Sequence, residues 1–537
     1  MKRNVRYLAI LSFFLVVVLI GLFKIVDFDT GWHMKAGEYI YSSRSIPKVD
    51  MFSYIAQGNK WVDSHWLFQL LLYLSYSLGG VSGSIILRIL VGCLTFGLLF
   101  MAAYRKEYYP VPLIICLSTL FMSFQRFLLR PEIFTFLFLA LFVYCMENFS
   151  KHPRLSLVMI PVGQALWANM HGLHVLGIVF ISLYLLGDLL QALLSRYIPG
   201  FPAPAGPRLQ GRGGPLWPPT QGKLGQATVE AKAGEWKQKV LLFGLTCLAL
   251  LINGNGFDGI AYPYKIFSEL KAKPTIFSMV AELVSPFAIK HAPFPDPSLI
   301  YKIFIPVTVL ALICQLKRVR LAHLLPYGAF LYLSVMAIRN VPLFAIVATP
   351  MTILNIYGIL DFLRERKFFA AKWPVSTPVP VAVSMAVGFL LTALCLGTCV
   401  SIANNGLYHR LNYLRTFGFG VSDTFPHEAV EYLKSRNLPG NIFNSSDIGG
   451  YLLWQMYPPK QVALDGRWEV YGDFLDNIPR LNDPKYFAEL TTKYHIEAII
   501  LYKRSWETAL MYPWLQISPD WQFAKDTATA IVYEKVD

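Results

Sequence analysis

Charged residues are scarce in this sequence. They make up 15% of the 537 residues, against roughly 25% in soluble domains. Apolar residues make up 55%, and the mean hydropathy is +0.45. So little charge excludes a chain built only of ordinary soluble domains, and it predicts a membrane protein with many spans.

Cysteine motifs and a continuous basic face are also lacking. The seven cysteines lie within or beside apolar runs and none follows Cys399, so the sequence has no disulfide framework and no metal-type cysteine spacing. The net charge is +15, yet residues 401–537 carry 13 basic and 16 acidic side chains. Because the basic residues fall in short clusters between apolar runs, they indicate membrane topology, and nucleic acid is excluded as a partner.

Eleven apolar runs approach the length of about 20 residues that a helix needs to cross a bilayer. The first run has a basic flank but no small-x-small cleavage site after it, so we expect a retained span and not a signal peptide. The predicted spans are 7–26, 83–104, 109–125, 132–147, 155–169, 173–193, 239–254, 300–315, 321–338, 341–361 and 378–400.

The basic clusters predict the orientation of these spans. They fall at every second connection, which places the N-terminus in the cytoplasm and residues 401–537 outside a cell inner (plasma) membrane. The Pro- and Gly-rich loop 196–238 is predicted to be a flexible cytoplasmic linker. The first outer loop is 27–82, and its stretch 66–80 is predicted to be a helix on the outer surface, with a tilted span as the alternative.

Polar residues gather at the predicted outer ends of the spans. Three arginines lie there, on the side where the positive-inside tendency disfavours them, so they need an anionic partner; a guanidinium fits a phosphate well. We therefore expect a lipid phosphate as ligand, with acidic residues as a base for an acceptor hydroxyl or as ligands for Mg²⁺ or Mn²⁺. The residues are Asp27, Asp29, His33, Asp50, Asp63, His65, Arg126, Arg130, Glu132, Asn169, His171, His174, Asn253, Asn255, Glu282, Arg339 and Asn340.

Each of these residues, taken singly, has a simpler interpretation. One boundary arginine, such as Arg126 or Arg130, would snorkel to lipid head groups. A lone histidine such as His171 is more often a packing residue, and Asp50 after a proline would shape a turn. The hypothesis of a reaction centre depends on the convergence of all of them at one bilayer depth.

The pattern "DTGWHMKAGEYI...SIPKVDMFSYIAQGNKWVDSHWL" lies in a long first outer loop just beyond the first span. With many spans and an external C-terminal domain, it resembles a bacterial branch of the GT-C superfamily of integral membrane glycosyltransferases. That superfamily includes protein O-mannosyltransferases, aminoarabinose transferases and oligosaccharyltransferase catalytic subunits. The resemblance implies a sugar donor linked to a polyprenyl phosphate. The first loop lacks the adjacent Asp-Glu pair of protein O-mannosyltransferases.

The resemblance also implies roles for particular residues. The catalytic aspartate of the family maps to Asp29, with Asp27 as the near alternative and Asp63 as a second acidic position. Asp29 and Asp63 would be the ligands if a divalent cation takes part. The phosphate-binding arginines of the family correspond to some of Arg126, Arg130 and Arg339, and the other expected substrate-binding residues are Glu132, Asn169, His171, His33 and Asp447.

The segment 401–537 is predicted to be an α/β domain outside the membrane. Its expected elements are a helix in 427–440 and strands at 441–445, 461–465, 497–502 and 530–535. The patch "SSDIGGYLLW" resembles the Trp-Trp-Asp-Tyr-Gly signature of oligosaccharyltransferases, with serines in place of both tryptophans, so Asp447 is expected near the acceptor. Alternatively, Asp447 caps the helix that begins at Ile448, and Asp465-Gly466 is a turn.

Three functions are compatible with these features. The first is a glycosyltransferase that moves a sugar from a polyprenyl-phosphate-linked donor to an external glycan, lipid or protein. The second is a transporter or flippase of an anionic lipid, and the third is a non-catalytic scaffold with an external binding domain. Polar residues biased to one face and the lack of repeated halves favour the transferase over the transporter.

Overall fold

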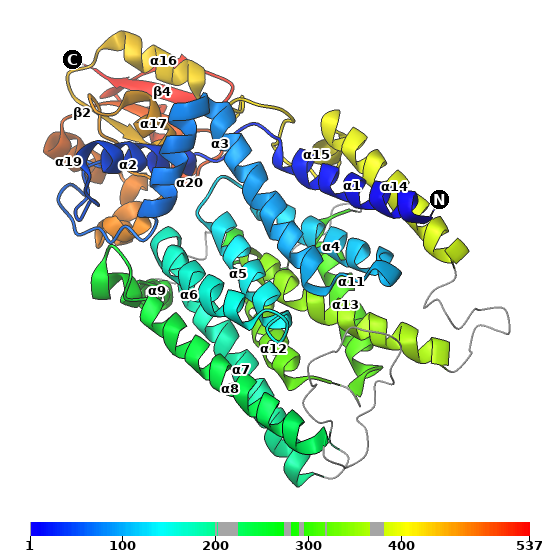
Figure 1. The fold of residues 1–537 in the computed structure, drawn as a ribbon. Coiled ribbons are helices and arrows are strands. Elements are labelled where there is room, and N and C mark those ends of the chain that lie inside the picture. Colours follow the sequence, from blue (N-terminus) through cyan, green and yellow to red (C-terminus); the bar gives the residue numbers. More distant parts are fainter. Residues whose placement is uncertain are drawn as a thin grey trace.

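A bundle of long helices carries a small α/β domain at one end (Figure 1). The computed structural model describes residues 2–198, 201, 224–272, 281–288, 295–316, 319–365 and 381–536. The predicted fold class, an α-helical polytopic bundle with a C-terminal α/β domain, is confirmed. Most of the predicted linker 196–238 lies outside the described residues.

Every predicted span overlaps a helix of the bundle, although 7–26 and 239–254 run past the ends of their helices at Gly21 and Ala249. The helices are α1 (Lys2–Gly21), α3 (Trp66–Ala103), α4 (Pro110–Ser123), α5 (Glu132–Glu147), α6 (Pro153–Met170), α7 (Val175–Tyr197), α8 (Leu224–Ala249), α11 (Pro297–Ile313), α12 (Leu321–Met336), α13 (Val341–Glu365) and α14 (Val381–Ala403). Within the described ranges, five stretches are long and apolar enough to cross a membrane: Arg3–Gly21, Trp66–Ala103, Gly172–Tyr197, Ile338–Leu363 and Val381–Ala403.

The helix α3 is kinked at a pair of glycines. Gly79 and Gly80 leave helical geometry, and Gly80 has a φ of 57°, which favours glycine. The part before the kink packs against α2 (Asp29–Ser43), and the part after it joins the bundle. The stretch 66–78 is therefore a separate helical segment ahead of the span, as expected for a helix of the first outer loop.

The C-terminal residues form one four-stranded sheet with the order β1-β2-β4-β3. Its strands are β1 (Asn441–Asn444), β2 (Ile496–Tyr502), β3 (Trp521–Asp526) and β4 (Ala530–Lys535); β1 and β2 are parallel and the other pairs are antiparallel. The other helices of this domain are α16 (His427–Arg436), α17 (Gly449–Met456), α18 (Phe474–Asn477), α19 (Pro484–Tyr494) and α20 (Trp506–Leu515). The short helix α15 (Gly406–Arg410) packs on α14.

One predicted strand was wrong and one strand was missed. Residues 461–465 do not join the sheet, because Val462 pairs with the first loop: its N–H donates to Phe52 O at 3.0 Å and its carbonyl accepts from Tyr54 N at 3.1 Å. The strand at 521–526 takes the fourth place. Its central side chains are mostly exposed, so it has little apolar signal in the sequence.

The helix α2 is held between the C-terminal domain and the bundle (Figure 1). Gly31 faces α17, where an added Cβ would lie 2.1 Å from Gly450 O. Gly37 faces α3, where an added Cβ would lie 2.1 Å from Gln69 O. Because no side chain fits at either place, glycine is what allows α2 to contact both neighbours so closely.

A fully buried arginine joins the first loop to the C-terminal domain. The Arg467 guanidinium forms ion pairs with Asp50 of the first loop and with Asp465, and all three side chains are 0% exposed. Its Nε donates to Asp465 Oδ1 at 3.0 Å. The rings of Trp61 and Phe52 lie 4.7 and 5.0 Å from the guanidinium carbon. Asp50 is thus an ion-pair partner and more than a turn residue.

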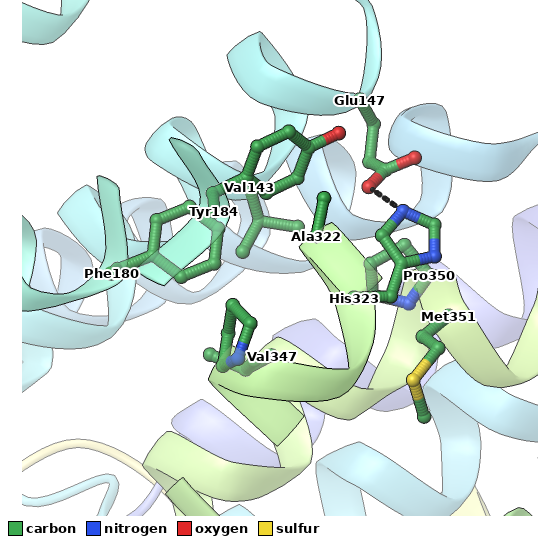
Figure 2. A pocket seen from close by; sticks show the side chains of 10 residues that line it. Val143, Glu147, Phe180, Tyr184, Ala322, His323, Val347, Pro350 and Met351 are labelled. Carbon is green, nitrogen blue, oxygen red and sulfur yellow. Dashed lines mark ion pairs between the residues drawn. The ribbon is translucent and has the colours of Figure 1, made fainter. Parts of the chain in front are cut away.

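A smaller polar group lies at the far end of α5, in a pocket between α5, α7, α12 and α13. His323 Nε2 lies 2.6 Å from Glu147 Oε1, and Figure 2 shows the two side chains pointing toward one another. Arg320 donates from Nη2 to the Tyr184 hydroxyl at 3.0 Å and lies 3.7 Å from Glu147. These contacts fix the helices to one another at the end away from the C-terminal domain.

Substitution of Arg467 by leucine should strongly destabilise the protein. The change leaves Asp50 and Asp465 buried without a cation, a loss of roughly 3–5 kcal/mol in the free energy of unfolding. The melting temperature of the purified protein measures the effect. The control variant Arg436→Gln removes an ion pair whose arginine is 50% exposed, so it should change the melting temperature little. Equal melting temperatures for both variants would contradict this assignment.

Candidate active site

Asp27 and Asp29 bind one arginine from the loop before α5. Arg130 donates from Nη2 to Asp27 Oδ1 at 2.8 Å and from Nε to Asp27 Oδ2, and its Nη2 lies 3.0 Å from Asp29 Oδ2. The aspartates are held in place because residues 22–27 pair with the C-terminal segment at the bridges Phe23–Phe417 and Ile25–Val421. The N-terminal end of α2 therefore faces the loop before α5.

Asp29 is the more accessible of the two aspartates. Its side chain is 24% exposed, against 5% for Asp27. The indole N–H of Trp32 donates to Asp29 Oδ1 at 3.2 Å. Burial raises the pKa of Asp29 to about 6; Arg130 opposes this rise and the charge of Asp27 adds to it. A carboxyl group with such a pKa can accept a proton near neutral pH.

Two further acids complete an ion-pair network with the arginines. Arg126, at the end of η2 (Phe124–Arg126), donates from Nε to Glu132 Oε2 at 2.9 Å and pairs through Nη1 with Glu282 of η4 (Ala281–Leu283). Arg130 Nη1 donates to the same oxygen, Glu282 Oε1, at 3.3 Å. Burial opposes ionisation of Glu282, but Arg130 and Arg126 outweigh it and lower its pKa to about 2.

The third predicted arginine lies beside this network. Arg339 belongs to η6 (Ile338–Asn340), whose Ile338 N donates to Val284 O at 2.9 Å, so η4 and η6 are neighbours. Its charge also lowers the pKa of Glu282. Within the part of the chain that the structure describes, the half-buried Arg339 side chain makes no ion pair or hydrogen bond. The structure thus brings Asp27, Asp29, Arg126, Arg130, Glu132 and Arg339 together; their roles stay predictions.

The predicted histidines and Asp63 form a second buried group next to α2. The rings of His33 and His65 lie 5.7 Å apart, and those of His65 and His171 lie 5.6 Å apart. Asp63 Oδ1 accepts from Gln69 Nε2 at 2.9 Å. Burial lowers the pKa of His65 to about 4 and raises that of Asp63 to about 7. This group therefore contains neutral imidazoles at pH 7.

Asn169 and Asp447 lie outside both groups. Asn169 Oδ1 accepts from Trp66 Nε1 and from Gly254 N, both at 2.8 Å, which ties α6 to the first loop and to the turn before α9 (Gly256–Ala272). Asp447 is exposed on η7 (Ser446–Ile448). The capping alternative for Asp447 is wrong, because α17 begins at Gly449 without a side-chain cap.

Sequence reasoning missed two arginines beside the network and the role of a third. Arg88 donates from Nε to Gly21 O at 3.0 Å, and Arg415 donates from Nη1 to Phe124 O at 2.8 Å, so each binds the carbonyl end of a helix. A charge inside a predicted span was a signal for Arg88; Arg415 has no signal in the sequence. Arg467 follows Asp465 and Gly466, which were given as a turn, and its own role was not predicted.

The segment 465–467 also forms a wall of the site. A Cβ added at Gly466 would lie 2.2 Å from Asp29 Oδ1, so the C-terminal domain packs directly on the carboxyl group. Asp465 adds to the raised pKa of Asp29. The site is therefore shared between the first loop, the bundle and the C-terminal domain.

A divalent cation on Asp29 and Asp63 does not fit these residues. Asp29 is bound by Arg130, and Asp63 is fully buried and bonded within its own loop, with no contact to Asp29 among the described residues. The guanidinium of Arg130 lies between the carboxylates of Asp27, Asp29 and Glu282, where a cation would need them as ligands. No group of three potential metal ligands occurs in the described ranges.

Comparison with known proteins identifies the fold. No family model matches the sequence, and no match was found among curated proteins. The structure is similar to the archaeal oligosaccharyltransferase AglB of Archaeoglobus fulgidus, solved with an inhibitory peptide and a dolichol-phosphate (TM-score 0.54, 11% identity, 92% of this chain and 69% of that chain). It is also similar to ArnT of Cupriavidus metallidurans bound to undecaprenyl phosphate (TM-score 0.52, 11% identity, 99% and 97%).

Both similar structures are GT-C superfamily members, so this chain has the GT-C fold. The resemblance found in the first outer loop is thus confirmed for the fold, and the bacterial branch stays a prediction.

Removal of Arg130 should destabilise the protein and reverse the pH dependence of this site. In Arg130→Gln the carboxylates of Asp27, Asp29 and Glu282 lose their shared cation and repel one another when ionised. We expect the melting temperature of this variant to rise as the pH falls from 7 to 5, because protonation of the acids relieves the repulsion. A variant with the melting temperature of the wild type over this whole range would contradict the account of Arg130.

Proposed function

We propose that this protein is a membrane glycosyltransferase that moves a sugar from a polyprenyl-phosphate-linked donor to an acceptor. The observation that carries the proposal is the network of arginines and acids at the junction of the bundle and the α/β domain. The GT-C fold supports it, and so do the lipid phosphates bound by both similar enzymes. A glycan, a lipid or a protein remains eligible as acceptor.

Asp29 is the proposed base. An inverting transfer needs a group that takes the proton of the acceptor hydroxyl as the hydroxyl oxygen attacks the sugar. Asp27 accepts two hydrogen bonds from Arg130 and is nearly buried, so it serves to hold the guanidinium. Asp29 makes one contact with Arg130 and keeps more exposed surface, which suits a group that must meet a substrate.

The arginines are proposed to bind the donor's phosphate. Arg126 and Arg130 each direct Nη1 toward the same place, and Arg339 lies next to them. A guanidinium matches phosphate oxygens in geometry and charge. Positive charge at this place stabilises the phosphate that leaves when the sugar is transferred.

The acceptor is proposed to approach from the side of the α/β domain. Residues 465–467 form a wall at Asp29, and Asp447 is exposed on the same domain. With the predicted topology, this side faces out of a cell inner membrane and the N-terminus faces the cytoplasm. The donor's lipid tail lies in the bilayer beside the bundle.

Asp29→Asn should abolish transfer with normal protein levels. Loss of the base lowers the rate by about 100-fold or more. The assay follows radiolabelled sugar from a polyprenyl phosphate donor into product in proteoliposomes. Asp423→Asn, which removes an aspartate 87% exposed in an ion pair with Lys24, is the matched control and should keep full activity. Movement of labelled lipid without release of free carrier phosphate would favour a flippase, and full activity of Asp29→Asn would remove Asp29 from the reaction.

The transfer rate should depend on pH through Asp29. Its carboxylate is the active form above the pKa of about 6, so the rate should be constant above that value and fall about ten-fold per pH unit below it. A pH series of kcat/KM with the wild-type protein measures the profile. A rate that rises as the pH falls from 7 to 5 would contradict the assignment of Asp29 as the base.

A further inference from the structure

Two guanidinium groups converge on a single oxygen atom. Arg126 Nη1 forms an ion pair with Glu282 Oε1, and Arg130 Nη1 donates to the same atom at 3.3 Å. These arginines come from the loop between α4 and α5, whereas Glu282 comes from a segment more than a hundred residues later. The two nitrogen atoms thus define one anion position.

The remaining nitrogens of both arginines are held by other acids, and Arg130 Nη2 also lies 3.0 Å from Asp29, whose side chain is 24% exposed. Arg126 uses Nε and Nη2 for Glu132, whose side chain is 3% exposed. Arg130 uses Nε and Nη2 for Asp27, whose side chain is 5% exposed. The Glu282 side chain is 29% exposed and contacts Nη1 of both arginines, so an anion that replaces it leaves Glu132 and Asp27 in place.

The surroundings of this anion position fit a phosphate better than a carboxylate. Arg339 lies on η6, whose Ile338 N donates to Val284 O beside Glu282 at 2.9 Å, and no described side chain pairs with Arg339. A phosphate has oxygens enough for three guanidinium groups, whereas Glu282 presents one oxygen to two of them. Ser285 Oγ donates to Val335 O at 2.8 Å, which ties the segment after Glu282 to α12.

We propose that Glu282 occupies the place of the donor's phosphate and is exchanged for it when the donor binds. The inference rests on the proposed function. The exchange keeps one negative charge between Arg126 and Arg130 in both states, so neither arginine is left buried without an anion. It also makes binding selective, because a lipid without an anionic head group cannot replace the carboxylate. The low pKa of Glu282 keeps this competition present at neutral pH.

Removal of the competing charge should tighten phosphate binding. The full chain in detergent is titrated with undecaprenyl phosphate, undecaprenol and inorganic phosphate, and the dissociation constants are read from tryptophan fluorescence. We expect Glu282→Gln to bind undecaprenyl phosphate about ten-fold more tightly than the wild type. Glu282→Ala should do the same, and melting temperatures confirm that both variants fold. If the Glu282 variants also bind inorganic phosphate more tightly by the same factor, and inorganic phosphate competes with undecaprenyl phosphate, the exchange is supported and needs only the phosphate group.

Two control variants separate exchange from a general effect of charge. Glu147→Gln removes a paired carboxylate at the far end of α5 and should change no dissociation constant. Glu132→Gln removes a charge on the same Arg126, but that acid positions the guanidinium, so binding should weaken. The proposal would be overturned if Glu132→Gln bound undecaprenyl phosphate as tightly as Glu282→Gln does. It would also be overturned if Glu282→Gln bound undecaprenol more tightly than the wild type.

The outcomes also separate this proposal from the proposed function. Binding of undecaprenyl phosphate that Glu282→Gln leaves unchanged or weakens overturns the exchange and leaves the transferase in place. No binding by the wild type or by either Glu282 variant overturns the lipid-phosphate donor, and the exchange with it.

Discussion

The guanidinium of Arg130 forms ion pairs with three carboxylates. Asp27 and Asp29 lie at the N-terminal end of α2, and Glu282 lies in η4. Buried charges lose hydration, and each would be costly alone. Together they offset that cost, so the acids hold the arginine and the arginine keeps Asp27 and Glu282 beside Asp29. The shape of the site depends on this cation, which with Arg126 also keeps Glu282 ionised.

The C-terminal domain completes the site. The helix α2 packs between α17 and α3, and Gly466 lies against the Asp29 carboxyl group. Arg467 binds Asp50 and Asp465 and so fixes the first loop to this domain. Asp29, the proposed base, therefore stands on an element that contacts both parts of the protein. In the proposed transfer, this arrangement would join a lipid-linked donor in the membrane to an acceptor outside it.

Much of this architecture was predictable from the sequence. Length and hydropathy located each helix of the bundle, because burial in lipid imposes long apolar runs. Polar residues at the ends of those runs pointed to Asp29, Arg126 and Arg130. The ion-pair partners of these residues were not predictable from the sequence. No local pattern indicates that Glu282 binds both arginines or that Arg467 binds Asp50, because these pairs depend on tertiary contacts. The prediction of a sheet strand at 461–465 was wrong for the same reason, because the partner of this segment lies in the first loop.

The central claim is that two arginine nitrogens, now on Glu282, bind the phosphate of a lipid-linked sugar donor. An experimental structure of the full chain with undecaprenyl phosphate tests it most directly. The account predicts density for the phosphate within hydrogen-bond distance of Arg126 Nη1 and Arg130 Nη1, with the Glu282 side chain turned away. Phosphate density elsewhere on the bundle, with Glu282 still bound to both arginines, would contradict it.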